Sequence, residues 1–358
     1  MRKSAFFSLI FSFLFCFSAT IRAAENDYVV RCIAFYNLEN LFDTVHDEGK
    51  NDFEYLPDGG MHWTPIKYEH KLHNLAYAIS QFGLDKSPLG AVCVGVAEVE
   101  NKGCLDDLVK QPELADRNYQ PILLEGPDRR GVDVGFLYNP SFFTPVGKPI
   151  GYELKAHYAD GGVVKTRLQL LVSGYLKDDK GLVRDKIHVI VCHWPSRYGG
   201  EEASRPTRDT AAMLTKHICD SLYGRDPRAK IIVMGDLNDD PYNHSCAEVL
   251  NAKKNREDVT PQGFFNTMWQ RLDRGIGSPA YNGSWNLFDQ IIISEPLLNE
   301  QRTNTAWSYW QPEIFNKKFL TYQEGKDKGT PMRTHKGGVW TDGFSDHYPT
   351  MIYLIKQK

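Results

Sequence analysis

Apolar segments of strand length recur along almost the whole chain and constrain its fold more than any other feature. Strands are predicted at residues 28–36, 91–97, 131–138, 168–176, 186–192, 230–234, 288–293 and 351–355. Helical spacing of apolar residues predicts helices at 67–82 and 205–222. Some consecutive strands are joined by links too short to hold a helix. The pattern therefore predicts an α/β fold in which mixed sheets pack on each other with helices outside.

Polar clusters stand at the ends of several of these segments. The clusters are Asn37-Leu38-Glu39-Asn40, Glu98-Val99-Glu100-Asn101, His193-Trp194-Pro195-Ser196-Arg197, Gly235-Asp236-Leu237-Asn238-Asp239 and Ser345-Asp346-His347. Carboxylates, amides and imidazoles at strand ends are the groups that a divalent-metal phosphoester hydrolase needs. Their recurrence indicates an active site at one edge of the sheets.

Two of the clusters supply candidate metal ligands. Asn37 and Glu98 each come directly after an apolar strand, and a hard cation such as Mg²⁺ or Mn²⁺ prefers oxygen ligands of this kind. Taken alone, Asn37 also fits a turn or helix cap and Glu98 a solvated strand end.

Two further clusters supply candidate catalytic groups. Asp236 can accept a proton or orient water, and Asn238 can donate to a phosphate oxygen, although the same residues suit an ordinary turn. Asp346 directly precedes His347 and can hold its imidazole in one tautomer while raising its basicity.

A second histidine and a carboxylate embedded in an apolar strand complete the catalytic candidates. His193 stands at the mouth of a strand, where it can stabilise a phosphorane or protonate a leaving group. Asp289 lies inside a strand, and a buried charge is costly unless it is paired, so we expect a histidine partner. Arg130 and Arg167 can grip phosphate in a fork, or serve as surface cations.

The N-terminus has the order of a secretory signal. Arg2 and Lys3 precede an apolar run over residues 5–17, and small and polar residues follow. The run is too short to cross a bilayer comfortably. Residues 1–23 are therefore predicted to be a signal peptide, and 24–358 a single domain.

The predicted destination is the periplasm or the cell exterior, with no membrane span. Cys16 suggests a lipid-anchored alternative, but the bulky Phe15 before it disfavours that form.

The charge balance excludes broad, charge-driven binding of nucleic acid. The chain has 42 Lys and Arg against 45 Asp and Glu. Without Arg2, Lys3 and Arg22, a chain that starts at Ala24 has 39 against 45 and a net charge of −6. A local basic groove stays possible.

Six of the seven cysteines lie beyond the predicted signal. Cys32, Cys93 and Cys192 lie inside apolar strands, where cysteine is usually a small buried residue, so we expect them to be unpaired. The sequence has no Cys-x-x-Cys pair, which disfavours a zinc site.

Taken in order, the clusters resemble the endonuclease/exonuclease/phosphatase superfamily over roughly residues 28–356. The resemblance implies a four-layer αββα sandwich, with two packed mixed sheets and helices on both outer faces. It implies Mg²⁺ or Mn²⁺ held by Asn37 and Glu98, with Asp236 and Asn238 contacting the phosphate and the attacking water. It also implies that His347, oriented by Asp346, is the general base.

The same resemblance implies that His193 is the central histidine, with Asp289 as its carboxylate partner. Arg167 matches a phosphate-side arginine less closely. Deoxyribonuclease-type members carry a DNA-contacting arginine where this chain has Val99-Glu100-Asn101, which weakens an assignment to duplex DNA. Residues 307–322 have no counterpart and are interpreted as a lid or surface cover rather than a substrate-stacking wall.

These observations predict an exported, metal-dependent phosphodiesterase, most simply a nuclease acting on nucleic acid. The alternatives are a phosphatase or phosphodiesterase for lipid headgroups or small phosphates, and an inactive binding protein. The inactive form is disfavoured because every expected catalytic position is filled. A monomer with no stable protein partner is expected.

Overall fold

A computed structural model describes residues 28–158, 160–181, 183–281, 283–298 and 301–358 of the chain. The predicted signal peptide, with its alternative lipid anchor at Cys16, lies outside these residues. Within them, no helix is long and apolar enough to cross a membrane.

The first sheet has six strands in the order β15-β18-β1-β2-β4-β3. Their bounds are β1 Tyr28–Leu41, β2 Ala91–Val99, β3 Gln120–Leu123, β4 Asp133–Tyr138, β15 Ser308–Ile314 and β18 Thr350–Gln357. Only β1 and β2 are parallel; the other neighbours are antiparallel.

The second sheet has eight strands in the order β10-β11-β14-β9-β8-β7-β5, with β6 also beside β7. Their bounds are β5 Phe143–Pro145, β6 Ile150–Tyr152, β7 Gln169–Lys177, β8 Val183–His193, β9 Lys230–Asp236, β10 Ala252–Lys253, β11 Phe264–Asn266 and β14 Asp289–Ser294. Here β8 and β9 are parallel, as are the short β10 and β11.

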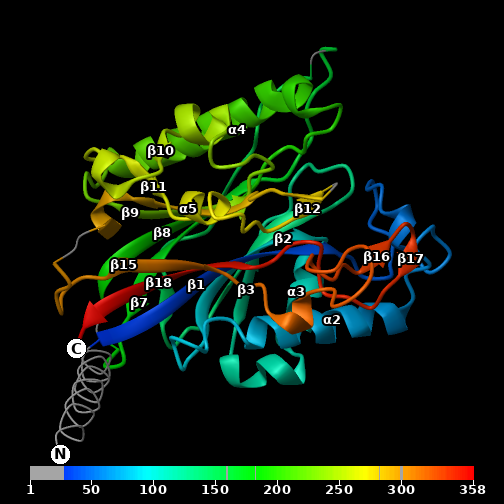
Figure 1. Ribbon diagram of the computed structural model, residues 1–358, viewed down its shortest axis with the longest axis horizontal. Coiled ribbons are helices and arrows are strands. Elements are labelled where there is room, and N and C mark those ends of the chain that lie inside the picture. The colour runs from blue at the N-terminus through cyan, green and yellow to red at the C-terminus, as the bar shows by residue number, and fades with distance from the viewer. Residues whose placement is uncertain (1–27, 159, 182, 282, 299–300) are drawn as a thin grey trace, which may run out of the picture.

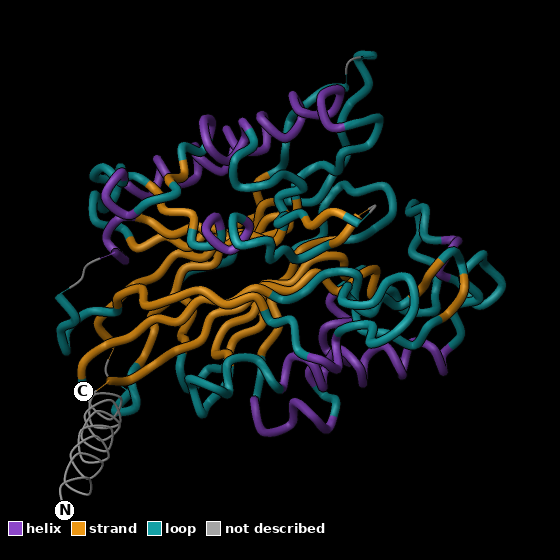
Figure 2. The backbone as a smooth tube through the Cα atoms, viewed as in Figure 1, coloured by secondary structure: helices purple, strands orange, loops and turns teal. Residues whose placement is uncertain are grey.

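Helices cover the two outer faces, so the layers run helix, sheet, sheet, helix (Figures 1 and 2). Helix α4 (Glu201–Tyr223) lies on the second sheet, and α2 (Pro65–Ser80) and α3 (Lys102–Val109) lie on the first. This arrangement confirms the predicted four-layer αββα sandwich.

Shorter elements complete the fold. They are α5 Trp269–Leu272, a π-helical turn at Ser245–Val249, the hairpins β12 Ala280–Tyr281 with β13 Ser284–Trp285 and β16 His335–Lys336 with β17 Val339–Trp340, and 3-10 turns at Phe53–Tyr55, Pro112–Arg117, Arg256–Asp258, Glu295–Leu298 and Lys318–Leu320.

Alternation along the strands explains why the second sheet reads as continuously apolar. In β8, Val189 and Val191 join the core between the two sheets, whereas Ile190 and Cys192 join the core beneath α4. Both faces of the sheet are buried, so neither set of alternating positions is free to be polar.

The six cysteines from Cys32 onward are all free and buried. The prediction that Cys32, Cys93 and Cys192 are unpaired core residues is therefore confirmed in the structure. Burial raises the pKa of the Cys192 thiol to about 12, so this side chain stays neutral in the core.

The interpretation of residues 307–322 as a lid or surface cover is wrong for the first half of the stretch. Residues 308–314 form β15, an edge strand of the first sheet that pairs with β18. Trp307 is 1% exposed. Its indole nitrogen donates to the carbonyl of Leu176 in the second sheet, at 3.2 Å. The apolar side chains of this stretch therefore serve the packing of the two sheets.

Candidate active site

The candidate active site lies where two pairs of parallel strands end together. Strands β1 and β2 end at the same edge of the first sheet, and β8 and β9 end at the adjoining edge of the second. The carboxyl ends of parallel strands present their side chains at one edge, which explains why the predicted polar clusters meet.

One cross-strand row of the second sheet carries three of the site residues. His193 of β8 is opposite Asp236 of β9, which is opposite Asp289 of β14. A Cβ atom on Gly235 would lie 2.1 Å from the carbonyl oxygen of Cys192, so only glycine permits this close pairing. The register of the sheet therefore places an imidazole beside two carboxylates.

His347 completes the row from the loop before β18. Its Nδ1 lies 2.6 Å from Oδ2 of Asp289, which is fully buried. Burial lowers the pKa of His347, but the carboxylates of Asp289, Asp346 and Asp236 outweigh it and raise the pKa well above its usual value. Asp289 thus fixes the ring and leaves Nε2 facing Asp236, at 3.9 Å.

The pairing of histidines and carboxylates differs from the prediction in both places. Asp346 does not hold His347 by a hydrogen bond: its Oδ1 is 3.9 Å from Nε2, and its Oδ2 accepts from Arg333 at 2.9 Å. Asp289 does not pair with His193. The ladder turns Asp289 toward the loop before β18, so the expected histidine partner is His347.

His193 is buried and neutral. Its Nε2 lies 3.6 Å from Asp236 and 3.9 Å from Glu98, and its Nδ1 has no hydrogen-bond partner among the described residues. Burial, followed by the charges of Arg167 and Arg130, lowers its pKa well below the usual value. His193 can therefore donate or accept a hydrogen bond without carrying a charge.

Asn37 and Asp236 join the two sheets at the centre of the site. The amide nitrogen of Asn37 donates to Oδ2 of Asp236 at 3.0 Å. Burial raises the pKa of Asp236 to about 7, while the charge of His347 lowers it and that of Asp289 raises it further. Burial is thus the main reason why the carboxyl group of Asp236 binds a proton more readily than usual.

Glu98 lies at a bulge in β2, opposite β1, where the pairing register shifts. Its backbone has a φ of 60°, and Glu39 and Asn40 on the neighbouring strand also have positive φ. Non-glycine residues rarely adopt this conformation, and bulges re-aim side chains. Oε2 of Glu98 accepts from the backbone nitrogen of Asn40 at 3.1 Å.

Asn238 follows β9 with a φ of 53°. Its backbone nitrogen donates to Oδ1 of Asp236 at 2.9 Å, and its side chain donates to the carbonyl of Trp194 at 3.0 Å. Asn238 is thus held between the ends of β8 and β9, beside the row that carries His193.

The two predicted phosphate-binding arginines differ in their surroundings. Arg167 is buried, contacts Asp128 at 3.2 Å and donates to the carbonyl of Trp194 at 2.8 Å, with Nε unpartnered within the described chain. Arg130 is exposed and donates to Oδ1 of Asn40 at 3.1 Å. Arg167 therefore supports the loop behind His193, and Arg130 lies at the rim.

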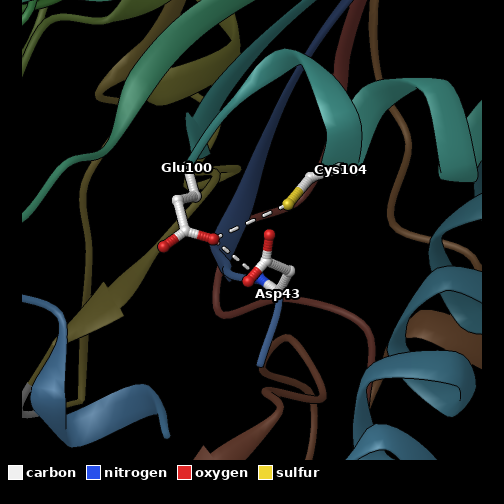
Figure 3. A group of neighbouring side chains, drawn as sticks. All are labelled: Asp43, Glu100 and Cys104. Carbon is white, nitrogen blue, oxygen red and sulfur yellow. Dashed lines mark hydrogen bonds between the residues drawn. The ribbon is translucent and has the colours of Figure 1, made fainter. Parts of the chain in front are cut away.

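A second group of neighbouring polar side chains consists of Asp43, Glu100 and Cys104. Oε2 of Glu100 accepts from the backbone nitrogen of Asp43 at 2.7 Å, and Sγ of Cys104 is 3.8 Å away (Figure 3). Burial, opposed by this backbone contact, raises the pKa of Glu100 to about 8. Glu100 therefore links the segment after β1 to the start of α3.

Sequence reasoning missed a buried ion network next to the site. Glu39 accepts from Arg333 at 3.3 Å and from the backbone of Thr334 at 2.6 Å. Burial and then the charge of Asp346 raise the pKa of Glu39 to about 7. Glu39 belongs to the polar cluster Asn37-Leu38-Glu39-Asn40, so the sequence could have indicated it. Arg333 lies in a loop where no sequence pattern marks it as functional.

Comparison with protein families gives one match, to the family described as Endonuclease/Exonuclease/phosphatase family, over residues 32–356. No curated protein matches the sequence.

Several solved structures share the fold. An endonuclease/exonuclease/phosphatase family protein from Bacteroides thetaiotaomicron is 15% identical, with a TM-score of 0.52 over 92% of this chain and 98% of that one. A mannosyl-6-phosphatase from the same organism is 15% identical, with a TM-score of 0.51 over 90% and 99%. TDP2 from D. rerio, complexed with a single-strand DNA product, is 13% identical, with a TM-score of 0.51 over 91% and 98%.

Proposed function

Because this chain belongs to the endonuclease/exonuclease/phosphatase family, and is therefore a phosphoester hydrolase, we propose that its hydrolysis depends on a divalent metal. The observation that carries the proposal is the row formed by His193, Asp236, Asp289 and His347, with Asn37 and Glu98 across from it. The row combines a base, a water-orienting carboxylate and oxygen ligands, which is the set that such a reaction needs.

The donor set fits a hard cation. Glu98 and Asn37 would hold Mg²⁺ or Mn²⁺ through oxygen atoms, with Asp236 beside them. Burial raises the pKa of Asp236, and the charge of Asp289 adds to the rise. A bound metal would supply charge neutralisation at the phosphate.

The remaining residues divide the work of in-line attack by water. His347 takes the proton at Nε2, because Asp289 occupies Nδ1. Asp236, 3.9 Å from Nε2, orients the water. The neutral His193 and the amide of Asn238 donate to phosphate oxygens as charge develops, and Arg130 provides a cation at the rim.

Two substrate classes follow from the sequence, and one structural observation separates them. TDP2 binds a DNA product, which supports the nuclease expectation. A small polar cavity opens beside the cluster, lined in part by Glu39, Asn40 and Arg333. The cavity favours a compact phosphate ester, such as the substrate class named for the mannosyl-6-phosphatase, so we rank a small-phosphate hydrolase before a nuclease.

We further infer that residues 24–358 act as one exported, monomeric domain. The predicted signal peptide at 1–23 supports the export.

One assay panel tests the proposal. The purified protein is given p-nitrophenyl phosphate, bis-p-nitrophenyl phosphate, single-stranded DNA, plasmid DNA, RNA and sphingomyelin, with Mg²⁺, with Mn²⁺ and with EDTA. We expect hydrolysis that EDTA abolishes, and in Glu98→Gln a loss of about 10–100-fold at limiting Mg²⁺. Hydrolysis that persists in EDTA, or an unchanged Glu98→Gln, contradicts the metal assignment.

A further inference from the structure

Arg197 ends the polar cluster that begins with His193, and the proposed reaction gives it no role. It lies in the loop that leads from β8 to α4, the helix that covers the second sheet (Figure 1). Its side chain is only 21% exposed. Because a charge withdrawn from water is costly unless partners compensate it, the partners of this guanidinium indicate what Arg197 does.

The guanidinium is bonded to the backbone of a proposed phosphate-binding residue. Nε of Arg197 donates to the carbonyl of Asn238 at 2.9 Å. Asn238 has a left-handed backbone with a φ of 53°, which is unfavourable for a residue other than glycine. Its side-chain amide donates to the carbonyl of Trp194 at 3.0 Å. The loop after β8 therefore holds Asn238 twice, through its backbone and through its side chain.

The two terminal nitrogens of Arg197 fix the plane of the guanidinium. Nη1 donates to Oε2 of Glu201, at the start of α4, at 2.7 Å. Nη2 donates to Oδ1 of Asn243, in the loop after β9, at 3.0 Å, and lies 3.3 Å from Oδ1 of Asp239. Three nitrogens are thus engaged in different directions. This fixes one orientation of the planar fork, which a lysine ammonium cannot reproduce.

The face of the guanidinium packs on a ring beside the third strand of the row. Its central carbon lies 4.6 Å from the ring centroid of Phe288, which directly precedes Asp289 at the start of β14. The carbonyl of Phe288 accepts from the backbone nitrogen of Leu237 at 2.8 Å. Arg197 therefore contacts the segments that follow β8, follow β9 and precede β14, the three strands that supply the row of site residues.

The carboxylates nearest to Arg197 keep other partners without it. Asp239 forms an ion pair with the buried Arg208, whose Nε lies 2.7 Å away. Asp240 accepts from a backbone nitrogen of the loop before β14 at 2.7 Å. Loss of Arg197 would therefore leave both buried carboxylates partnered, and it would take away the donor to the carbonyl of Asn238.

We propose that Arg197 is a positioning residue that fixes the orientation in which the amide of Asn238 meets the phosphate. The inference rests on the proposed hydrolysis, in which this amide donates to a phosphate oxygen as charge develops. An amide has two N–H bonds, so the bond to Trp194 leaves the other for the phosphate. Because a preorganised donor stabilises the transition state more than the bound substrate, loss of Arg197 should lower kcat and leave KM nearly unchanged.

A double-mutant cycle tests the inference, with Arg197→Gln, Asn238→Ala and the double variant. The substrate is p-nitrophenyl phosphate or bis-p-nitrophenyl phosphate with Mg²⁺, whichever the wild type hydrolyses faster. Arg197→Lys keeps the charge, and it replaces Arg197→Gln in the cycle if that variant does not fold. The matched control is Arg205→Gln, which also removes ion pairs from α4, at a side chain that is 49% exposed.

We expect Asn238→Ala to lower kcat about 10²-fold, as the removal of one preorganised donor does. Arg197→Gln should lower kcat about 10-fold, because it misplaces this donor without removing it, and should keep KM within about 2-fold of the wild type. In the Asn238→Ala background, Arg197→Gln should cost less than about 3-fold, because the amide that Arg197 positions is gone. Arg205→Gln should match the wild type.

The same fold-loss from Arg197→Gln in both backgrounds would show that Arg197 acts independently of Asn238, and would overturn the inference. A raised KM with an unchanged kcat would also overturn it, while leaving the proposed reaction intact.

If the wild type hydrolyses no substrate, the proposed reaction fails, and hydrogen–deuterium exchange of residues 236–240 then judges the positioning by itself. Faster exchange of this segment in Arg197→Gln than in the wild type and in Arg205→Gln supports the inference. Unchanged exchange overturns it.

Discussion

The two halves of the active region are built from different parts of the fold. The phosphate side takes Asn37, Glu98, His193, Asp236 and Asp289 from five strands of two sheets. The cavity side takes Tyr55, Arg333, Thr334 and His335 from turns and a two-residue hairpin strand. Strand pairing holds side chains in fixed positions, as a catalytic reaction requires, whereas loops tolerate sequence change. The proposed catalytic row therefore comes mainly from strands, with His347 added from the loop before β18, whereas the cavity is lined mainly by loop residues.

Removing the base should have the largest effect and should not depend on the leaving group. His347→Ala deletes the proton acceptor, which typically costs about 10²–10⁴-fold in kcat. The measurement is kcat on p-nitrophenyl phosphate and on a polyol phosphate, with the melting temperature as a control for folding. A near-normal kcat together with a lowered melting temperature would show that His347 is structural.

Removing the strand-borne anchor should have the next largest effect. Asp289→Asn should lower activity about 10–100-fold, because Asp289 fixes the ring of His347. Asp289 also raises the pKa of His347. The base must be neutral to act, so activity falls as pH drops through this pKa. The variant should shift this acidic limb to lower pH. A pH–rate profile that keeps its acidic limb would contradict the pairing.

Removing the loop-borne carboxylate should have a smaller effect. Asp346→Asn should cost less than about 10-fold, because Asp346 lies 3.9 Å from Nε2 and its side chain is 32% exposed. The acidic limb of the pH–rate profile of Asp346→Asn should also shift to lower pH, but by less than in Asp289→Asn. A loss in Asp346→Asn that equals or exceeds that in Asp289→Asn would reverse the comparison between strand and loop.

The smallest effect concerns stability rather than catalysis. Glu100 has a folded pKa of about 8, raised from 4.5 mainly by burial, so the folded state loses stability as pH rises between these values. Glu100→Gln removes this loss and should gain about 1–3 kcal/mol of unfolding free energy at pH 9 relative to pH 5. Denaturant unfolding at both pH values measures it, with exposed Glu54→Gln as control. If Glu100→Gln and the wild type differ in unfolding free energy by the same amount at pH 5 and pH 9, the raised pKa of Glu100 is refuted.

The eight predicted strands are all present, and most of the candidate site follows from where they end or begin, whereas β15 and the shorter strands were not predicted. Asn37, Glu98, His193, Asp236 and Asp289 all lie where a run of apolar residues stops or starts, so local pattern was sufficient. The partner of each histidine could not be predicted, because it depends on the antiparallel pairing of β14 with β9 and on the loop before β18. Asp346 was predicted to be the partner of His347 because it is adjacent in the sequence, whereas the structure pairs His347 with Asp289.

The cavity could not be predicted for the same reason. Glu39 and Arg333 are far apart in the chain, and Arg333 lies outside any periodic segment. No pattern in the sequence indicates that Glu100 links the segment after β1 to α3; the sequence shows only that Glu100 lies where deoxyribonuclease-type members carry an arginine. Long-range contacts between irregular segments leave no periodic trace in the sequence.

The pairing of β1 with β18 inside the first sheet determines when the fold can be completed. All 8 residues of β18 pair with residues 28–35 of β1, with Tyr28 opposite Gln357, so the first described strand gains this neighbour only from the last one (Figure 1). Pairing between the two ends of a chain is slow to form. His347 itself arrives only with the final strand. Until β18 and the loop before it have been made, the first sheet therefore lacks a strand and the candidate site lacks His347.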